Sequence, residues 1–211
     1  MPTLSQPPTV ALTDSPSPWR WTREACSRLK ELEFLPERFE LIEGVIYEIM
    51  PKNRRHVLGL RRVRNWLFTI FGEDVVQEQD PIEIASEDQT FNDPEPDIAV
   101  LRQSVESYRE QAPGSADVLL LVEISDATLS LDRNRKARLY ARAGITDYWA
   151  LDVRGRRLFV HREPGNEGYD SVLEYASDEM VAPLAAQHAT IRVMELLPST
   201  EFPQVTDYDK T

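Results

Sequence analysis

The strongest constraint on the fold is a run of five apolar residues, 118–122, that ends at Glu123. A run without a polar face predicts a central β-strand that other elements cover on both sides. A predicted helix at about 132–143, ended by Gly144 as a C-cap, and a further strand at 148–153 follow it. This strand–helix–strand order predicts a right-handed crossover in a mixed sheet, and therefore an α/β or α+β domain.

Hydrophobic periodicity predicts further elements on both sides of this unit. Alternating apolar residues around Glu43-Gly44 predict a β-hairpin at 39–49, N-terminal to the core. Thr22 is the expected N-cap of the first helix. The other predicted elements are helices at 21–32 and 56–71, an interrupted strand at 75–79 and 81–85, strands at 97–101, 156–162 and 171–175, and a last core segment at 191–197.

Length and composition bound the domain organisation. The 211 residues include a Pro-rich N-terminus, and they predict one folded domain at 19–197, between a disordered arm at 1–18 and a disordered tail at 198–211. No apolar segment reaches the length needed to cross a bilayer. The single cysteine, Cys26, cannot form an intramolecular disulfide. We therefore expect a soluble cytoplasmic protein without a membrane segment.

The formal net charge of −12 bears on the partners. Proteins that coat DNA regardless of its sequence tend to be basic, because neutralising phosphates supplies much of their affinity. The total charge therefore speaks against such a coat, but it leaves room for a local basic surface. Two segments, 54–64 and 133–142, are rich in arginine. Each is either such a surface or a solvated helix face.

A lysine falls on the buried face of the predicted helix that follows Glu123. Lys136 shares a helical stripe with Tyr140, and this stripe should face the sheet. A buried ammonium group needs a nearby carboxylate or a site that is open to water. The available carboxylates are Glu123, at the end of the apolar run, and Asp97, at the start of the strand at 97–101.

Asp97 and Glu123 predict a site for a divalent metal ion. Mg²⁺ and Mn²⁺ prefer oxygen ligands and commonly take only one or two carboxylates beside water. These side chains and the backbone carbonyl of Ile124 form a candidate ligand set. Such an ion activates water for hydrolysis, with Lys136 orienting or deprotonating that water or stabilising charge. The structural alternative is a buried ion pair between Lys136 and Glu123, with Asp97 capping a strand end.

Other kinds of site find less support in the sequence. The histidines His56, His161 and His188 show no spacing with Cys26 that is typical of structural zinc, and there is no G-x-S-x-G motif or Gly-rich phosphate loop. His56 lies on the buried stripe of its helix, where it is either a core or capping group or borders a cleft. A glycosidase would need aromatic platforms near its carboxylates, and the sequence supplies none there.

A combination of short motifs resembles one protein family over about residues 21–197. Each motif alone is unspecific, but the combination is specific. The motifs are Phe39 to Gly44, His56, Pro96 to Val100, Leu121 to Asp126, Asp132 to Lys136, and Tyr140 to Trp149. Together they resemble the Uma2 family of proposed restriction endonucleases, formerly the domain of unknown function DUF820, in the PD-(D/E)XK nuclease superfamily. The resemblance implies a restriction-endonuclease-like mixed β-sheet core flanked by helices, with an N-terminal β-hairpin extension.

The resemblance also implies roles for individual residues. Asp97 and Glu123 match the metal ligands of the superfamily. The superfamily lysine normally follows the glutamate by two positions, and that position is Ser125 here, which we take as an accessory residue. Lys136, on the following helix, resembles the lysine that other members of the family offer instead.

Glu40 and His56 are implied near the cleft, as a further acidic group and a phosphate or water contact. The implied activity is that of a Mg²⁺- or Mn²⁺-dependent endonuclease acting on DNA, and a cutter of both strands needs two sites, as in a homodimer. The alternative is a catalytically silent nuclease-like domain that binds nucleic acid or a protein partner. The acidic net charge keeps this alternative open, whereas the retention of all three site residues speaks against it.

Overall fold

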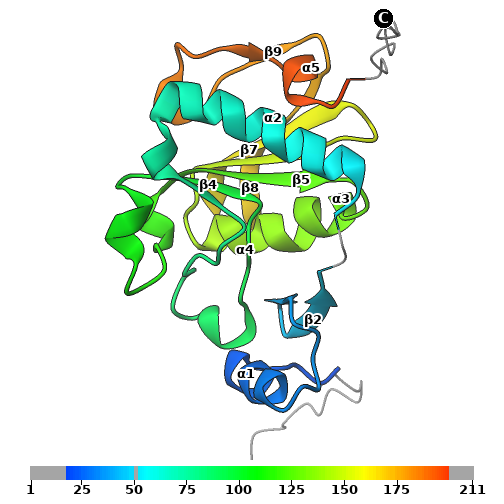
Figure 1. Cartoon of the computed structure of the whole chain (residues 1–211), viewed down its shortest axis with the longest axis vertical. Helices are drawn as coiled ribbons and strands as arrows, with labels where there is room; N and C mark the ends of the chain where they lie inside the picture. The colour runs from blue at the N-terminus through cyan, green and yellow to red at the C-terminus, as the bar shows by residue number, and fades with distance from the viewer. Residues whose placement is uncertain (1–17, 50–51, 200–211) are drawn as a thin grey trace, which may run out of the picture.

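A six-stranded mixed sheet forms the centre of the computed structural model, which describes residues 18–49 and 52–199 (Figure 1). The strands, in their order across the sheet, are β3 (Val76–Glu78), β4 (Ile98–Leu101), β5 (Val118–Ser125), β6 (Asp147–Asp152), β7 (Arg157–Gly165) and β8 (Gly168–Ala176). Neighbouring strands are antiparallel except β5 and β6, which are parallel and joined by a helical crossover. This arrangement confirms the predicted fold class.

Helices cover both faces of the sheet, with α2 (Arg54–Phe71) on one side and the crossover on the other (Figure 1). Strand β5 supplies residues to the core on both faces. Leu120 and Val122 pack in the cluster that contains the buried side of α2, whereas Leu121 packs with Tyr140 on the crossover side. Two-sided burial is the physical reason why the run at 118–122 has no polar face.

The crossover contains a π-helical turn where the sequence predicts one α-helix at 132–143. The chain passes through α3 (Leu129–Leu131), the π-helical turn Asp132–Lys136, and α4 (Ala137–Arg142). Gly144 follows α4 with φ of 78°, in the left-handed conformation expected at a helix end. The helix therefore exists where predicted, but its first part has a different winding.

Tertiary contacts of Asp132 fix the start of this turn. The Asp132 carboxylate accepts hydrogen bonds from Ser125 Oγ at 2.7 Å and from Thr128 Oγ1 at 2.6 Å. Its backbone carbonyl accepts a third from the Tyr148 hydroxyl at 3.0 Å. Hydrophobic periodicity does not reveal a π-helical turn, because the turn depends on such contacts between distant elements.

The N-terminal part lies on the α4 side of the sheet, at the bottom of Figure 1. Helix α1 (Arg23–Glu31) begins at Thr22, whose Oγ1 accepts a hydrogen bond from Ala25 N at 3.1 Å. Strands β1 (Phe39–Ile42) and β2 (Val45–Glu48) form the predicted hairpin. Both turn residues have positive φ, and a Cβ on Gly44 would lie 2.6 Å from Arg20 Cβ, so the turn requires glycine.

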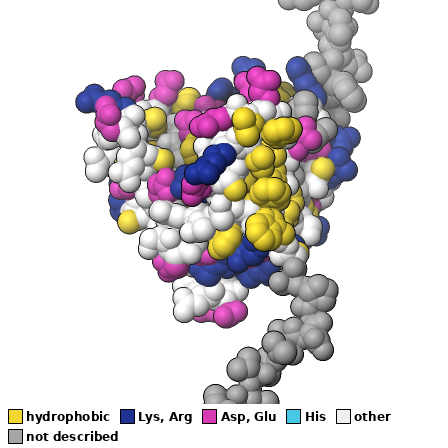
Figure 2. Space-filling view, turned by 90° about the horizontal axis from the view of Figure 1, so that it is seen from below, with side chains coloured by type: hydrophobic (Ala, Val, Ile, Leu, Met, Phe, Trp, Pro, Cys, Tyr) yellow, Lys and Arg dark blue, Asp and Glu magenta, His cyan; other side chains and the backbone are white. Residues whose placement is uncertain are grey.

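Figure 2 shows this N-terminal side with acidic and basic side chains intermixed around a band of hydrophobic ones. Large exposed hydrophobic residues of this part include Trp19, Leu32 and Phe34.

The C-terminal elements lie on the α2 side of the sheet. They are β9 (Met180–Val181), β10 (Ile191–Arg192) and α5 (Val193–Leu196), and short 3₁₀ helices occur at Glu73–Val75, Gln89–Phe91, Val105–Tyr108, Ser115–Asp117 and Leu184–Ala186.

One predicted strand segment, at 81–85, is wrong. In this stretch only Glu83 forms an isolated bridge, to Gly114. Ile82 and Ile84 are buried in two different hydrophobic clusters, and this packing produces the alternating pattern without strand pairing. Almost all of the predicted arm at 1–18 and tail at 198–211 lies outside the described residues. No helix in the described ranges is both long and apolar enough to span a bilayer.

Candidate active site

A cavity of about 250 Å³ lies where the hairpin, the start of α2 and the adjoining ends of β4 and β5 meet. Every predicted site residue except Ser125 lines it: Glu40, His56, Asp97, Glu123, Ile124 and Lys136. The hairpin reaches this place because Ile42 packs with Ile84 and with Leu139 of the α4 region. The fold therefore gathers residues that lie almost 100 positions apart in the sequence around one opening.

The antiparallel register of β4 and β5 sets Asp97 beside Glu123. Ile98 pairs with Val122, so Asp97, which immediately precedes β4, faces Glu123 when the register is extended by one residue. Paired residues of an antiparallel ladder lie on the same face of the sheet. The two carboxylates thus lie on the face that α4 covers, at the point where β4 begins and β5 ends.

Asp97 is buried and held by three neighbours. Its Oδ2 accepts a hydrogen bond from the Ile124 backbone N–H at 2.9 Å, and its Oδ1 lies 2.7 Å from Lys52 Nζ. His56 Nε2 lies 3.2 Å from the same Oδ1, without donating a well-aligned hydrogen bond. Burial alone would raise the pKa of Asp97, but His56 and Lys52 lower the pKa to about 2. Asp97 is therefore a carboxylate at any pH near neutrality.

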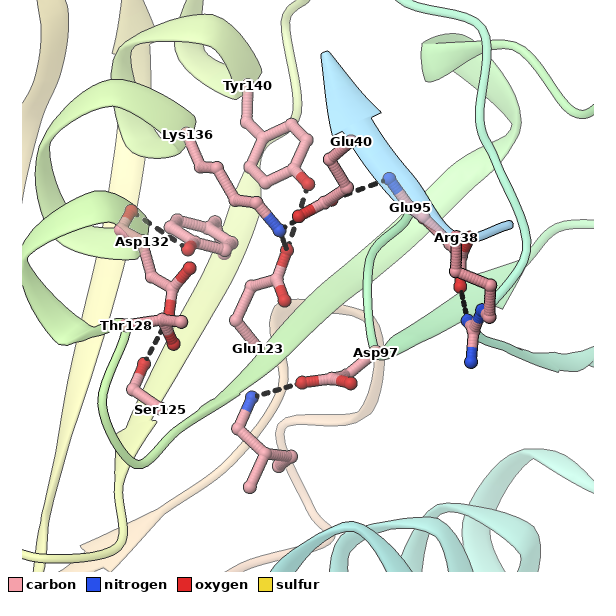
Figure 3. Close-up of polar contacts among 12 residues, drawn as sticks. Arg38, Glu40, Glu95, Asp97, Glu123, Ser125, Thr128, Asp132, Lys136 and Tyr140 are labelled. Carbon is pink, nitrogen blue, oxygen red and sulfur yellow. Dashed lines mark hydrogen bonds and ion pairs between the residues drawn. The ribbon is translucent and has the colours of Figure 1, made fainter. Parts of the chain in front are cut away.

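Glu123 lies in a cage of polar groups from three elements (Figure 3). Its Oε1 accepts hydrogen bonds from Lys136 Nζ at 2.9 Å and from the Tyr140 hydroxyl at 3.0 Å. Lys136 Nζ also lies 2.8 Å from Glu40 Oε1, which accepts a hydrogen bond from the Glu95 N–H at 2.8 Å. The lysine is thus clamped between a carboxylate of the sheet and a carboxylate of the hairpin.

Carboxyl groups outnumber lysines among the residues that line the cavity around Glu123. Burial raises the pKa of Glu123 well above its usual value; Lys136 opposes this rise, whereas Asp132, Asp97 and Glu40 add to it. Burial disfavours the Lys136 ammonium, but Glu123 and Glu40 nevertheless raise the pKa of Lys136 well above its usual value. Lys136 therefore stays protonated, and the carboxyl groups of Glu123, Glu40 and Asp132 surround this one ammonium.

The donor set fits a hydrated Mg²⁺ or Mn²⁺ ion. Asp97 and Glu123 supply two carboxylates, which is the number that Mg²⁺ commonly takes from a protein. The N–H of Ile124 points toward Asp97, and the carbonyl of the same strand residue points to the same side. Within the described ranges no three His, Cys, Asp or Glu side chains converge on one ion position.

The contacts expected of a purely structural role for these residues are also present. The Lys136–Glu123 ion pair exists, and Asp97 does accept a backbone hydrogen bond at a strand end. These contacts do not explain why Glu40 is added to an already paired lysine, or why the residues border a cavity. A buried ion pair needs only one carboxylate, and Lys136 here contacts two.

Ser125 does not line the cavity, but it helps to position a residue that does. The side chain is fully buried, and its hydroxyl donates to Asp132 at the start of the π-helical turn. This turn carries Lys136 into the site. Ser125, two positions after Glu123, therefore anchors the element that brings Lys136 into the site.

Two contacts of the site could not be predicted from the sequence. Lys52 is a single lysine in a connection without periodicity, and its only signal is its position four residues before His56. Tyr140 is predictable as a buried residue of the helical stripe, but its hydrogen bond to Glu123 is not. Burial and the adjacent Glu123 raise the pKa of Tyr140 well above its usual value, so its hydroxyl remains a donor.

The arginine-rich segments differ in their surroundings. In the segment at 133–142, Arg142 pairs with Asp88 at 2.8 Å, and the Arg133 guanidinium stacks on the Phe159 ring. In the segment at 54–64, Arg54 and Arg55 are exposed at the start of α2, beside the cavity. Arg54 and Arg55 are thus exposed next to residues that line the cavity.

Comparison with known proteins places the chain in a family. The structure is similar to a crystal structure described as "a putative nuclease belonging to DUF820 from Anabaena variabilis", with a TM-score of 0.56 and 16% sequence identity, covering 80% of this chain and 96% of that one. At this identity the similarity shows a shared fold. No curated protein matched the sequence. The Uma2 family, described as "Putative restriction endonuclease", matches residues 27–194, and because this span is most of the chain, the protein belongs to the Uma2 family.

Proposed function

We propose that the protein is a metal-dependent endonuclease that hydrolyses DNA phosphodiester bonds. One observation carries the proposal: Asp97 and Glu123 face each other at a cavity where carboxylates outnumber cations. Membership of the Uma2 family supports the same reaction class. A divalent ion would complete the charge balance of this cluster, and phosphodiester hydrolysis is a reaction that such an ion promotes.

The chain's residues take distinct roles in this proposal. Asp97, Glu123 and the Ile124 carbonyl would hold Mg²⁺ or Mn²⁺, which supplies a Lewis acid and lowers the pKa of bound water. Lys136 is protonated, so it orients water or stabilises negative charge and does not accept a proton. His56, which borders the cavity beside Asp97, is a candidate contact to phosphate or water.

The second candidate function is a catalytically silent domain that binds nucleic acid or a protein partner. The net charge of −12 favours the form of this alternative that binds a protein partner, because an acidic surface repels nucleic acid. The exposed Arg54 and Arg55 at the cavity mouth offset this repulsion locally. Because both functions include binding to a partner, only a test for catalysis distinguishes them.

A cleavage assay tests the proposed function. Supercoiled and linear DNA, and a matched RNA, are incubated with the protein and Mg²⁺, Mn²⁺ or EDTA. Cleavage of DNA is expected only with metal, and Asp97→Asn and Glu123→Gln are each expected to slow it about a hundredfold or more, because each removes one of two charged ligands. Asp170→Asn, at an exposed position of β8, should keep the wild-type rate.

Inert wild-type protein under all metal conditions would contradict the proposal and favour the silent domain. Cleavage that survives both carboxylate substitutions would indicate a contaminating nuclease or a different site. Cleavage of RNA but not of DNA would support metal-dependent phosphodiester hydrolysis and would contradict DNA as the substrate.

We also propose that the active form is a homodimer, because cutting both strands of DNA at one position requires two sites. Light scattering on protein separated by size is expected to give twice the mass of the chain. A monomer mass that persists in the presence of cleavable DNA would contradict this assembly.

A further inference from the structure

The cavity holds two lysines in unlike surroundings. Lys136 Nζ lies between Glu40 Oε1 at 2.8 Å and Glu123 Oε1 at 2.9 Å, and its side chain is 4% exposed. Lys52 Nζ lies 2.7 Å from Asp97 Oδ1, and its side chain is 20% exposed. Within the described part of the chain, Asp97 is the one carboxylate that pairs with Lys52. One ammonium is therefore enclosed, and the other borders water.

This difference decides which lysine can change partners. Moving Lys136 would leave two buried carboxylates without a cation, which is costly. Moving Lys52 breaks one contact, and the freed ammonium reaches solvent within the same cavity. The Lys52 side chain is 20% exposed, so water can solvate its ammonium when it leaves Asp97, and a cation that takes its place compensates the carboxylate. Lys52 is thus the lysine of the site that is better placed to change partners.

The contacts of Asp97 show what would displace Lys52 from this carboxylate. Oδ2 is engaged by the Ile124 N–H, whereas Oδ1 faces the cations Lys52 and, when protonated, His56. A divalent ion that binds Asp97 draws on the same negative charge and repels a nearby ammonium. Metal and Lys52 therefore compete for Asp97, and the lysine released by the metal remains beside the cavity.

We propose that Lys52 is a further catalytic residue, which pairs with Asp97 in the metal-free protein and transfers to a phosphate group of the nucleic acid when metal binds. A lysine ammonium binds phosphate as a compact point charge and suits such a transfer. The position of Lys52, next to Asn53 at the start of α2, places it beside the exposed Arg54 and Arg55. The phosphate part of this inference rests on the proposed function, whereas the competition with metal does not.

The test measures metal and DNA affinity on the same variants. Lys52→Met is expected to bind Mn²⁺ about tenfold more tightly by calorimetry, because the competing cation is gone. The same variant should bind a DNA duplex about tenfold more weakly in Ca²⁺, with the DNA checked for integrity, and the slope of log affinity against log salt should fall by about one. Opposite changes in the two affinities are a signature that loss of folding does not produce.

Two further variants complete the design. Lys52→Arg retains the charge, so its Mn²⁺ affinity and salt slope should stay near those of the wild type. Lys30→Met removes an exposed lysine of α1 and should change neither affinity. Unchanged Mn²⁺ affinity or an unchanged salt slope in Lys52→Met would overturn the inference, as would wild-type protein that binds no Mn²⁺.

The outcomes separate this inference from the proposed function. Wild-type protein that cleaves DNA with metal, combined with unchanged affinities in Lys52→Met, would overturn the role of Lys52 and leave the nuclease in place. Inert wild-type protein, combined with the opposite affinity changes in Lys52→Met, would overturn the nuclease and support the exchange of partners by Lys52.

Discussion

Replacing Lys136 with methionine is expected to lower the free energy of unfolding by about 3–5 kcal/mol in metal-free buffer. Methionine fills the space of the lysine stem, so the loss is mainly electrostatic. Without the ammonium, the oxygens of Glu40 and Glu123 that now share it would face each other in a buried site. Urea unfolding in the presence of EDTA measures the effect, and EDTA prevents a divalent ion from replacing the lost charge.

A second substitution identifies the cause of the loss. Glu40→Gln in the Lys136→Met background should recover part of the stability, with a coupling energy above about 1 kcal/mol, because it removes one of the two unpaired carboxylates. Lys30→Met, in the exposed part of α1, should change stability by less than about 0.5 kcal/mol. If Lys136→Met were as stable as the wild type, the carboxylates could not be carrying uncompensated charge.

Stability is also expected to fall by about 3 kcal/mol as the pH drops from 6.5 to about 4, through His161. His161 is 2% exposed and packs near the rings of Tyr148 and Tyr169. Burial lowers the pKa of His161 from 6.5 to about 4. Between these pH values the unfolded chain binds a proton that the folded chain does not, so stability rises with pH in this window. The contribution is complete above pH 6.5 and lost by about pH 4.

Comparing the unfolding free energies of the wild type and His161→Phe separates the titration of His161 from that of the carboxylates. His161→Phe keeps an aromatic ring at the position and cannot take up a proton, so its unfolding free energy should depend less on pH between 4 and 6.5. His188→Gln changes an exposed histidine and should follow the wild-type profile. Parallel profiles for the wild type and His161→Phe would show that His161 is protonated in the folded protein.

The parts of the fold and site that sequence predicts are those encoded by local patterns. The apolar run at 118–122 specifies a strand buried on both faces, and Glu43-Gly44 specifies a hairpin turn. Asp97 and Glu123 are recognisable because each is a charge at the end of an apolar element, and an antiparallel register suffices to bring them together. Lys136 is recognisable because it interrupts an apolar stripe.

The parts that sequence does not predict depend on contacts between distant elements. Lys52 joins the site because α2 starts beside Asp97, and no period or spacing in the sequence encodes this approach. Glu40 is expected near the cleft only from the family resemblance, and its contact with Lys136 depends on the packing of the hairpin against Leu139. The error at 81–85 has a related origin, because burial by two separate clusters imitates the alternation of a paired strand.

The π-helical turn ties the number of residues in the crossover to the winding of its helix. A π-helical turn closes its hydrogen bond over one residue more than an α-helical turn, so Asp132–Lys136 takes up an extra residue while the helix on either side keeps its phase. A relative that lost one residue here is expected to form a regular α-helix and to keep its lysine toward Glu123, with that lysine one position nearer to Ser125 in the sequence. Comparing relatives by residue type alone would miss this change, whereas comparing the spacing from Ser125 to the lysine would detect it.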